Sequence, residues 1–244
     1  MGQLLLNNLL FFYIGAIFGS FLNVVIYRLP LSISIVLPRS YCPNCKKSIP
    51  YYENIPILSF ILLKGNCSKC KKAISIQYPI VELISGLLFI FSFNNYTIIE
   101  SIFFIIISSL LLCIAIIDYK NFIIPLSLSI ISFFVIILYA LFFSEIMFHL
   151  FGMIIGFSYL GFIYLLTFLI IKKQPMGYGD FILMIVLGLW LGPLKILITI
   201  FSSSVLGLLY WSVISILRGY KKERKLPFGT FLSLTAILLY IIKI

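Results

Sequence analysis

Charged residues are scarce in this sequence: they make up 10% of its 244 residues, whereas hydrophobic residues make up 62%. A soluble domain of this length would carry a much larger charged fraction on its surface, so that class is excluded. The long apolar runs also lack a strict alternation of apolar and polar residues, which argues against a membrane β-barrel. Several runs approach or exceed the roughly 18–20 residues that a helix needs to cross a bilayer. The sequence therefore predicts an all-α polytopic membrane protein.

About eight transmembrane helices are expected. The predicted spans are residues 4–27, 79–94, 98–117, 123–143, 149–171, 181–193, 195–217 and 227–243. Gly192–Pro193 divides the long apolar run after residue 180, because proline removes a backbone donor and ends or begins a helix. The first run has no basic region before it and no small-residue cleavage site after it, so we expect a retained span and no signal peptide. The GxxxG spacing of Gly15 and Gly19 predicts close packing against another helix.

Basic residues are concentrated in four short segments between the apolar runs, which hold sixteen of the 18 Lys and Arg. Cytoplasmic loops are enriched in Lys and Arg, so this distribution predicts a cytosolic loop over residues 28–78 and an N-terminus outside. Only Lys195 and Lys243 then lie on the outer side. The net charge of +11 therefore reports membrane orientation. A nucleic-acid partner is not expected, since no basic face interleaved with aromatic residues is present.

Four of the five cysteines form two CxxC pairs in the predicted cytosolic loop, Cys42 with Cys45 and Cys67 with Cys70. Two such pairs at this separation are typical of a structural zinc site with four thiolate ligands. Disulfides are the alternative, but the cytosol keeps thiols reduced. A catalytic zinc would need an open coordination position. We therefore expect a structural Zn²⁺ that supplies much of the folding energy of this short polar loop.

The sequence contains only two aspartates, Asp118 at the end of the predicted third span and Asp180 at the start of the sixth. Ionisable groups at membrane depth are costly and mark functional sites. Two carboxyls that lie close together share a proton. The ionised member can then deprotonate a water while the protonated member polarises a peptide carbonyl. Both aspartates are expected at the cytosolic face, where they can form a proteolytic pair.

Asp180 closes the sequence Gly177-Tyr178-Gly179-Asp180. Glycines at 177 and 179 can take positive φ and let the backbone approach an extended peptide closely. The alternative is that Asp118 and Asp180 only cap helix ends. The residues alone do not separate the two interpretations, because GxGD is a short pattern.

Six stretches of the chain together resemble the bacterial prepilin peptidases, which are bifunctional leader peptidases and N-methyltransferases of the GxGD aspartyl type. The stretches are Gly19–Pro30, Pro38–Cys45, Glu53–Ile57, Gly65–Cys70, Tyr78–Leu83 and Leu226–Leu232. The resemblance implies an enzyme of the bacterial cell (inner) membrane that cleaves the leader of type IV prepilin-like precursors at the cytosolic face. It also implies N-methylation of the new N-terminus with S-adenosylmethionine as methyl donor.

The resemblance assigns the residues as follows. Asp118 and Asp180 would be catalytic, the four loop cysteines would bind zinc, and Gly65 and, more loosely, Glu53 would serve methyl transfer. Residues 1–27 would form the first span, 28–78 the zinc-binding loop associated with methyl transfer, and 79–244 the peptidase core. Family members often carry Lys two residues after the GxGD aspartate, where this chain has Ile182.

Two other function classes compete with the peptidase. An ion-coupled transporter would use Asp118 and Asp180 to carry ions, but it would place them near the bilayer midplane and show inverted repeats. No repeat is visible in the sequence. A zinc-stabilised scaffold without chemistry would tolerate Asn at both positions.

Overall fold

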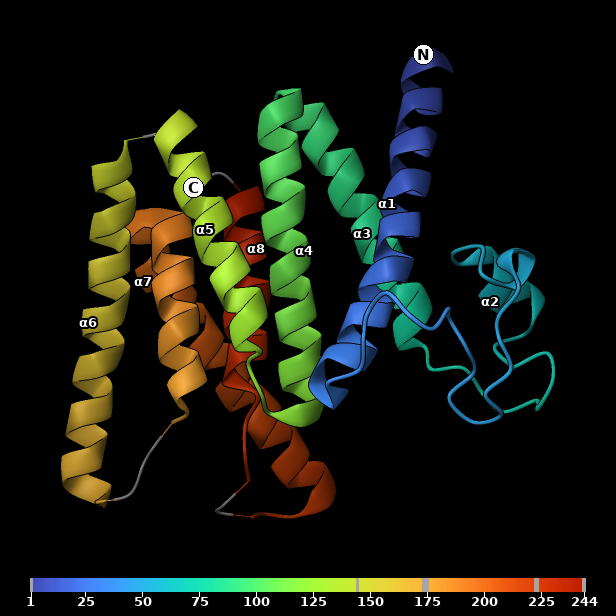
Figure 1. Cartoon of the computed structure of the whole chain (residues 1–244). Coiled ribbons are helices and arrows are strands. Elements are labelled where there is room, and N and C mark those ends of the chain that lie inside the picture. The colour runs from blue at the N-terminus through green and yellow to red at the C-terminus, as the bar shows by residue number, and fades with distance from the viewer. Residues whose placement is uncertain (1, 144, 173–175, 222–223, 243–244) are drawn as a thin grey trace. The chain divides into compact units, whose positions relative to one another are not determined.

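Helices make up the regular structure of the chain in a computed structural model that describes residues 2–143, 145–172, 176–221 and 224–242 (Figure 1). The α-helices are α1 (Gly2–Arg28), α2 (Leu58–Leu62), α3 (Gln77–Asn95), α4 (Ile98–Asn121), α5 (Leu126–Phe143), α6 (Ile146–Ile171), α7 (Tyr178–Arg218) and α8 (Phe228–Ile241). Two 3₁₀ turns are also present. The first, η1 (Leu29–Leu31), directly follows α1, and the second, η2 (Tyr51–Glu53), lies between the two CxxC pairs. The predicted all-α class is confirmed for the described residues, which include no strand beyond two isolated bridges.

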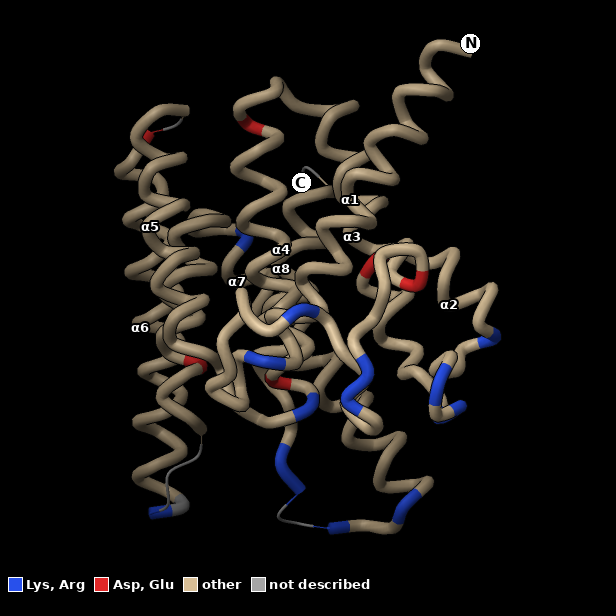
Figure 2. Tube along the Cα trace, turned by 45° about the vertical axis from the view of Figure 1, so that its right-hand side comes forward, with Lys and Arg blue, Asp and Glu red and all other residues tan. Residues whose placement is uncertain are grey.

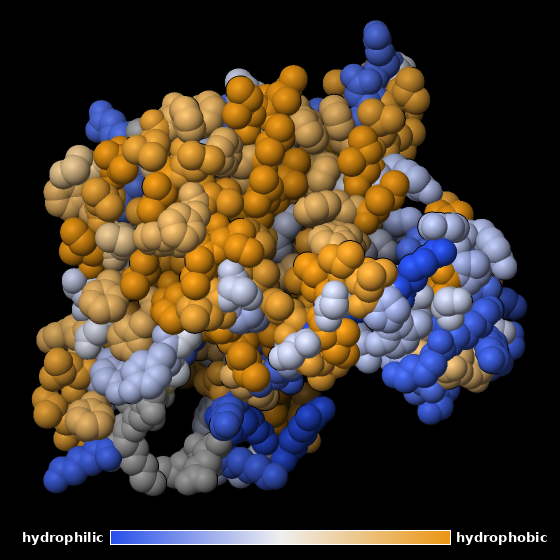
Figure 3. Space-filling model, in the orientation of Figure 1, coloured by the Kyte–Doolittle hydropathy of each residue, from blue (hydrophilic) through white to orange (hydrophobic). Residues whose placement is uncertain are grey.

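Within the described part of the chain, six helices are long and apolar enough to cross a membrane, namely α1, α3, α4, α5, α6 and α7. Their apolar side chains cover the helices in Figure 3, whereas hydrophilic side chains gather on the cysteine-bearing loop. The eighth predicted span corresponds to α8, whose 14 residues are fewer than the roughly 20 that cross a bilayer unaided. The expected count of eight spans is therefore not confirmed, although every predicted span overlaps a helix.

The sixth and seventh predicted spans lie within one 41-residue helix, α7. A straight helix of that length would measure about 60 Å, twice the hydrocarbon thickness of a bilayer. Gly192, with φ 76° and ψ −178°, is the one non-helical residue inside α7, and Pro193 follows it. The chain turns back at this point, so that the two segments of α7 run in opposite directions (Figure 1). The break predicted at Gly192–Pro193 is thus present as a turn within α7.

The chain divides into two compact units, residues Met1–Ile105 and Ile106–Ile244. In the first unit α1 packs on α3 through its small residues. A Cβ atom at Gly15 would lie 2.7 Å from the Ser85 carbonyl oxygen, and one at Gly19 would lie 2.8 Å from the Glu82 Cα. The close helix packing predicted from this GxxxG spacing is confirmed.

In the second unit α7 packs against α5, α6 and α8. The helix ends in this unit alternate so that α4 and α6 end, α7 begins and ends, and α8 begins on the same side (Figure 1). The Lys and Arg residues that follow these helices gather there too (Figure 2). Asp118 belongs to the last turn of α4 and Asp180 to the first turn of α7, so both aspartates lie at this basic end of the unit.

Candidate functional site

Asp118 is held at the end of α4 by the first turn of α8. The residue is 5% exposed, and its Oδ2 accepts a hydrogen bond from the Thr230 main-chain N–H at 2.8 Å. The Thr230 hydroxyl lies 3.1 Å from the same oxygen and 2.8 Å from the Ala115 carbonyl oxygen. The first turn of a helix has free N–H groups and favours a negative charge, so the start of α8 fixes the position of the Asp118 carboxyl.

Capping of its own helix does not explain Asp118, because a carboxylate in the last turn of α4 faces the unfavourable end of that helix's dipole. The residue instead accepts hydrogen bonds from the start of a helix more than a hundred residues later in the chain. Asp180 lies in the first turn of α7, where a carboxylate is favoured. Asp180 can therefore cap the start of its own helix, whereas Asp118 caps the start of α8 and not the end of α4.

The fold brings the two aspartates together. Their carboxyls lie close enough to interact electrostatically, and each belongs to the second unit. Gly177 precedes this helix start, and a Cβ there would lie 3.6 Å from Asp180 Oδ2 in ordinary contact. The carboxyls of Asp118 and Asp180 are thus within electrostatic range of each other in the second unit.

Ile124 separates the main-chain segments that carry the two halves of this site. A Cβ at Gly179 would lie 2.9 Å from the Ile124 Cβ, and a Cβ at Gly229 would lie 2.8 Å from its Cδ1. The Gly229 Cβ would also lie 3.1 Å from Asp118 Oδ2. Any side chain at either glycine would therefore displace Ile124 or the Asp118 carboxyl.

The glycines of the GxGD sequence do not have the backbone conformation that was expected. Gly177 is extended with φ −78° and ψ 151°, and Gly179 lies within α7, so neither has positive φ. That expectation is wrong, because the helix begins before Asp180 and includes Gly179. The requirement for glycine at 179 is steric and comes from Ile124.

Sequence reasoning assigned no role to Thr230 or Ile124. Thr230 lies in the stretch Leu226–Leu232, and its position after Pro227 is a signal for the first turn of a helix. That signal indicates free N–H donors but does not indicate which carboxyl they would meet. Ile124 follows Asp118 in a short connection, and nothing in its apolar character distinguishes it from its neighbours.

The four loop cysteines of the first unit form one cluster, with all sulfur atoms within 4.8 Å of one another. Cys42 Sγ lies 3.8 Å from Cys70 Sγ, and Cys45 Sγ lies 4.0 Å from Cys67 Sγ. Four thiolates around one zinc at about 2.3 Å would be about 3.8 Å apart in a tetrahedron. Two sulfur pairs already have about this separation, and the donor set fits a four-thiolate metal site.

Two similar turns build this cluster. In the first, the Cys42 N–H donates to the Lys47 carbonyl and the Ile49 N–H donates to Ser40. In the second, the Cys67 N–H donates to Lys72 and the Ile74 N–H donates to Gly65. Lys46 and Lys71 take equivalent positive φ angles of 57° and 56°. Each CxxC pair therefore presents its sulfurs from the same local fold.

The thiols of the second turn have strongly different acidities. The N–H groups of Cys70 and Lys69 stabilise the Cys67 thiolate and lower its pKa to about 6. At Cys70 the Lys72 N–H acts in the same direction, but desolvation and the neighbouring thiols outweigh it and raise the pKa to about 11. Four adjacent sulfurs cannot all ionise without a cation among them, which is the condition that a bound metal relieves.

The two residues linked to methyl transfer have structural roles in the same loop. Glu53 is tied to the second turn, since the Ser68 hydroxyl donates to its Oε2 at 2.7 Å and the Lys47 ammonium lies 3.5 Å from Oε1. Gly65 has φ +67°, and a Cβ there would lie 3.2 Å from the Phe60 ring. Glu82 of α3 accepts the Ile57 N–H at 2.7 Å and so fastens the loop to the helix.

Two known families match most of the chain, over residues 13–96 and 104–212. The bacterial peptidase A24 N-terminal domain matches residues 13–96, and the type IV leader peptidase family matches residues 104–212. No solved structure matches. The first family covers the loop and its flanking helices, and the second covers both aspartates. No family match points to a transporter, so that alternative is not supported.

Curated relatives named prepilin leader peptidase/N-methyltransferase align with most of this chain over most of their own length. The prepilin leader peptidase/N-methyltransferase of Dichelobacter nodosus is 32% identical, covering 99% of this chain and 94% of the relative. The protein of that name from Aeromonas salmonicida (strain A449) is 30% identical over 92% of this chain and 87% of the relative. That of Stutzerimonas stutzeri is 32% identical, covering 91% and 86%. With these relatives and both domain matches, the chain belongs to the type IV leader peptidase family.

Proposed function

We propose that this protein is a membrane aspartyl peptidase that cleaves the leader peptide of type IV prepilin-like precursors and then N-methylates the new N-terminus. The observation that carries the peptidase half is the meeting of Asp118 and Asp180, from distant parts of the sequence, at the basic end of one unit. Membership of a leader peptidase family supplies the substrate class. The relatives' name supplies the second activity.

In this proposal the two carboxyls share one proton and hydrolyse the peptide bond without a covalent intermediate. The ionised carboxylate takes a proton from a water, whose oxygen attacks the scissile carbonyl carbon. The protonated carboxyl polarises the carbonyl oxygen and later returns a proton to the departing amine. Because Asp118 Oδ2 faces the Thr230 N–H, Oδ1 is the oxygen that turns toward the water.

Thr230 positions Asp118 in both of its protonation states. One hydroxyl proton has two acceptors within reach, Asp118 Oδ2 and the Ala115 carbonyl oxygen. When the carboxylate is ionised, the hydroxyl donates to Oδ2. When Oδ1 has taken the proton from water, Oδ2 still accepts the Thr230 N–H, and the hydroxyl can turn its hydrogen to the Ala115 carbonyl oxygen. The carboxyl can therefore gain and lose a proton without moving and without leaving a buried polar atom unpaired.

Zn²⁺ is the metal that the four loop cysteines would hold, and its part would be structural. All four ligands are thiolates of the protein, so no coordination position remains for a substrate. The metal would supply folding energy to a loop that has few buried side chains of its own. Residues 28–78 then act as one module between the first span, residues 1–27, and the peptidase core, residues 79–244.

S-adenosylmethionine is the methyl donor in this proposal, and it supplies the methyl group for the new amine. Glu53 does not fit as a direct contact for it, because its carboxylate is already bonded to Ser68 and Lys47. Gly65 has no side chain and takes a positive φ beside Phe60 that other residues would adopt only with strain. Both residues act on methylation by holding the conformation of the loop.

The protein resides in the bacterial cell (inner) membrane, with its N-terminus outside and the aspartates at the cytosolic face. Support comes from the basic helix ends that surround Asp118 and Asp180 in the second unit (Figure 2). The two segments of α7 cross separately in this arrangement, since the chain turns back at Gly192.

The test is cleavage of a pilin-like precursor by purified Asp118→Asn and Asp180→Asn proteins in lipid. Each should abolish cleavage, because Asn can neither take nor give the proton. Glu100→Gln is the matched control, since it neutralises a carboxylate at the opposite end of α4. Sequencing of the product N-terminus, with its mass, reports both cleavage and methylation. Full cleavage by either Asn variant would refute the pair.

A further inference from the structure

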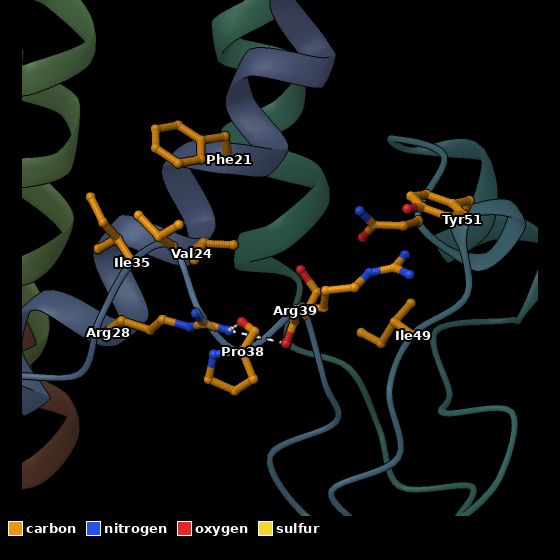
Figure 4. A pocket seen from close by; sticks show the side chains of 11 residues that line it. Phe21, Val24, Arg28, Ile35, Pro38, Arg39, Ile49 and Tyr51 are labelled. Atoms are coloured by element: carbon orange, nitrogen blue, oxygen red, sulfur yellow. Dashed lines mark hydrogen bonds between the residues drawn. The ribbon is translucent and has the colours of Figure 1, made fainter.

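A cavity of about 250 Å³ opens in the first unit, where α1 meets the loop that follows it (Figure 4). Its lining residues are Phe21, Val24, Arg28, Ile35, Val36, Pro38, Arg39, Ser40, Ile49, Tyr51 and Asn54. Two of these are arginines and none is acidic. Phe21, Val24 and Ile35 line its apolar part, and the guanidinium groups of Arg28 and Arg39 reach it from two different segments, the end of α1 and the loop (Figure 4). The lining therefore suits a molecule that is anionic at one end and apolar at the other.

Arg28 brings a buried positive charge to this cavity. Its side chain is 3% exposed, and its guanidinium donates to the carbonyl oxygens of Ser34 at 2.9 Å and Pro38 at 2.7 Å. These carbonyls satisfy donors but do not neutralise the charge. Within the described residues the only recorded salt bridge joins Lys47 and Glu53. The Arg39 carbonyl oxygen, at 3.2 Å, and the Tyr41 ring, 5.5 Å away, also surround this charge, and neither is anionic, so an anion beside Arg28 would be favoured.

Arg39 supplies the second cation at the exposed side of the cavity. Its guanidinium lies 3.9 Å from the centre of the Tyr51 ring, and the two stack. Stacking orders a side chain that would otherwise be free in solvent, so less entropy is lost when it binds an oxyanion. A planar guanidinium can form two parallel hydrogen bonds to a phosphate.

The apolar part of the lining continues along one face of α1. Leu10, Ile14, Ile17 and Phe21 follow one another at helical spacing, and each is about half exposed, between 46% and 58%. Val24 and Arg28 continue the same row into the cavity. The opposite face of α1, with Gly15 and Gly19, packs on α3. An apolar row therefore runs along a candidate membrane span and ends at a pair of cations.

We infer that this cavity binds the phosphate of an anionic phospholipid, with the acyl chains lying along the Leu10–Phe21 row. Charge complementarity selects the anion, and the apolar row selects a lipid over a soluble phosphate. Basic pockets at the ends of membrane helices favour anionic headgroups for the same reasons. This site lies wholly within residues 10–54 and does not depend on the proposed peptidase chemistry.

Native mass spectrometry of the purified full-length protein tests the inference. The protein is exposed in turn to phosphatidylglycerol, to phosphatidylcholine and to inorganic phosphate. One phosphatidylglycerol should be retained per chain, and neither of the other two. Arg39→Gln should weaken retention about fivefold, the share of one arginine near a membrane surface. Lys69→Gln removes a charge from the same loop outside the cavity and should leave retention unchanged.

Two further variants separate binding from misfolding. Arg39→Lys keeps the charge but loses the planar fork, so its retention should fall between those of wild type and Arg39→Gln, with unchanged zinc content. Val36→Ser, at a residue that is 76% exposed, should weaken phosphatidylglycerol retention and leave zinc content unchanged. Equal retention of phosphatidylcholine, or equal losses in Arg39→Gln and Lys69→Gln, would overturn the site. Displacement of the lipid by inorganic phosphate at equal concentration would show a soluble-anion site and overturn the lipid assignment.

Discussion

Replacing Thr230 with valine tests whether the first turn of α8 serves the chemistry of Asp118. Valine has nearly the shape of threonine and keeps the main-chain N–H that donates to Asp118 Oδ2 at 2.8 Å. It removes only the hydroxyl that lies 3.1 Å from that oxygen. The substitution therefore separates the hydroxyl from every other contribution of this residue.

The expected size of the effect follows from the hydroxyl's partner. A hydrogen bond to a charged group is worth about 1.5–3 kcal/mol. If that stabilisation acts on the ionised carboxylate during water attack, kcat should fall roughly tenfold to hundredfold. Thr230 acts through Asp118 and not on the peptide, so KM should change little.

Serine at the same position provides the discriminating comparison. Thr230→Ser keeps the hydroxyl and loses a methyl group, whereas Thr230→Val keeps the volume and loses the hydroxyl. Thr230 is 7% exposed, so a residue needed only for packing would tolerate valine better than serine. A residue needed for its hydroxyl gives the opposite order, with serine close to wild type.

The assay is steady-state cleavage of a pilin-like precursor by each variant in lipid, with thermal unfolding measured in parallel. Valine with wild-type kcat, or serine less active than valine, would refute the positioning role. A fall in kcat that tracked a loss of thermal stability in both variants would equally assign Thr230 to packing.

Three other predictions, at Gly179, Cys42 and Gly65, rest on the same structure. Gly179→Ala should destabilise the protein by about 1–3 kcal/mol and reduce cleavage, because its Cβ would meet Ile124 at 2.9 Å, whereas Gly177→Ala should be tolerated; cleavage and thermal unfolding report both. Cys42→Ser should abolish stoichiometric zinc and expose loop 28–78 to protease, and an unchanged digestion pattern would contradict a structural metal. Gly65→Ser, at φ +67°, should lower methyl transfer more than cleavage, and equal losses by mass spectrometry of the product would show general unfolding.

Much of this fold could be predicted because each membrane helix is a long apolar run in the local sequence. Each predicted span overlaps a helix, and the glycine–proline break at 192–193 is where α7 turns. The metal site in the loop could also be predicted, since two CxxC pairs are typical of zinc binding. The four sulfur atoms lie within 4.8 Å of one another. The count of eight spans is not confirmed, because α8 has 14 residues and the sixth and seventh predicted spans lie within one helix, α7.

The partners within the candidate site could not be predicted, because they depend on contacts between distant segments. Asp118 and Asp180 were identifiable as isolated carboxyls, but their approach depends on how α4 and α7 end and begin. The expectation of positive φ at Gly177 and Gly179 failed for a related reason. A glycine signals either backbone freedom or lack of space, and only the position of Ile124 shows that Gly179 serves the second need.

The reversal of α7 at Gly192 links both halves of the aspartate pair. The first segment of α7 begins with Asp180, and the second returns toward the same end of the unit (Figure 1). On its way it packs against α8, where the Ser203 and Thr235 hydroxyls are 2.6 Å apart in a buried contact. The first turn of that helix carries Thr230, which holds Asp118. One kinked helix thus supplies one carboxyl directly and anchors the helix that orients the other, so the geometry of the pair depends on a backbone turn far from either aspartate.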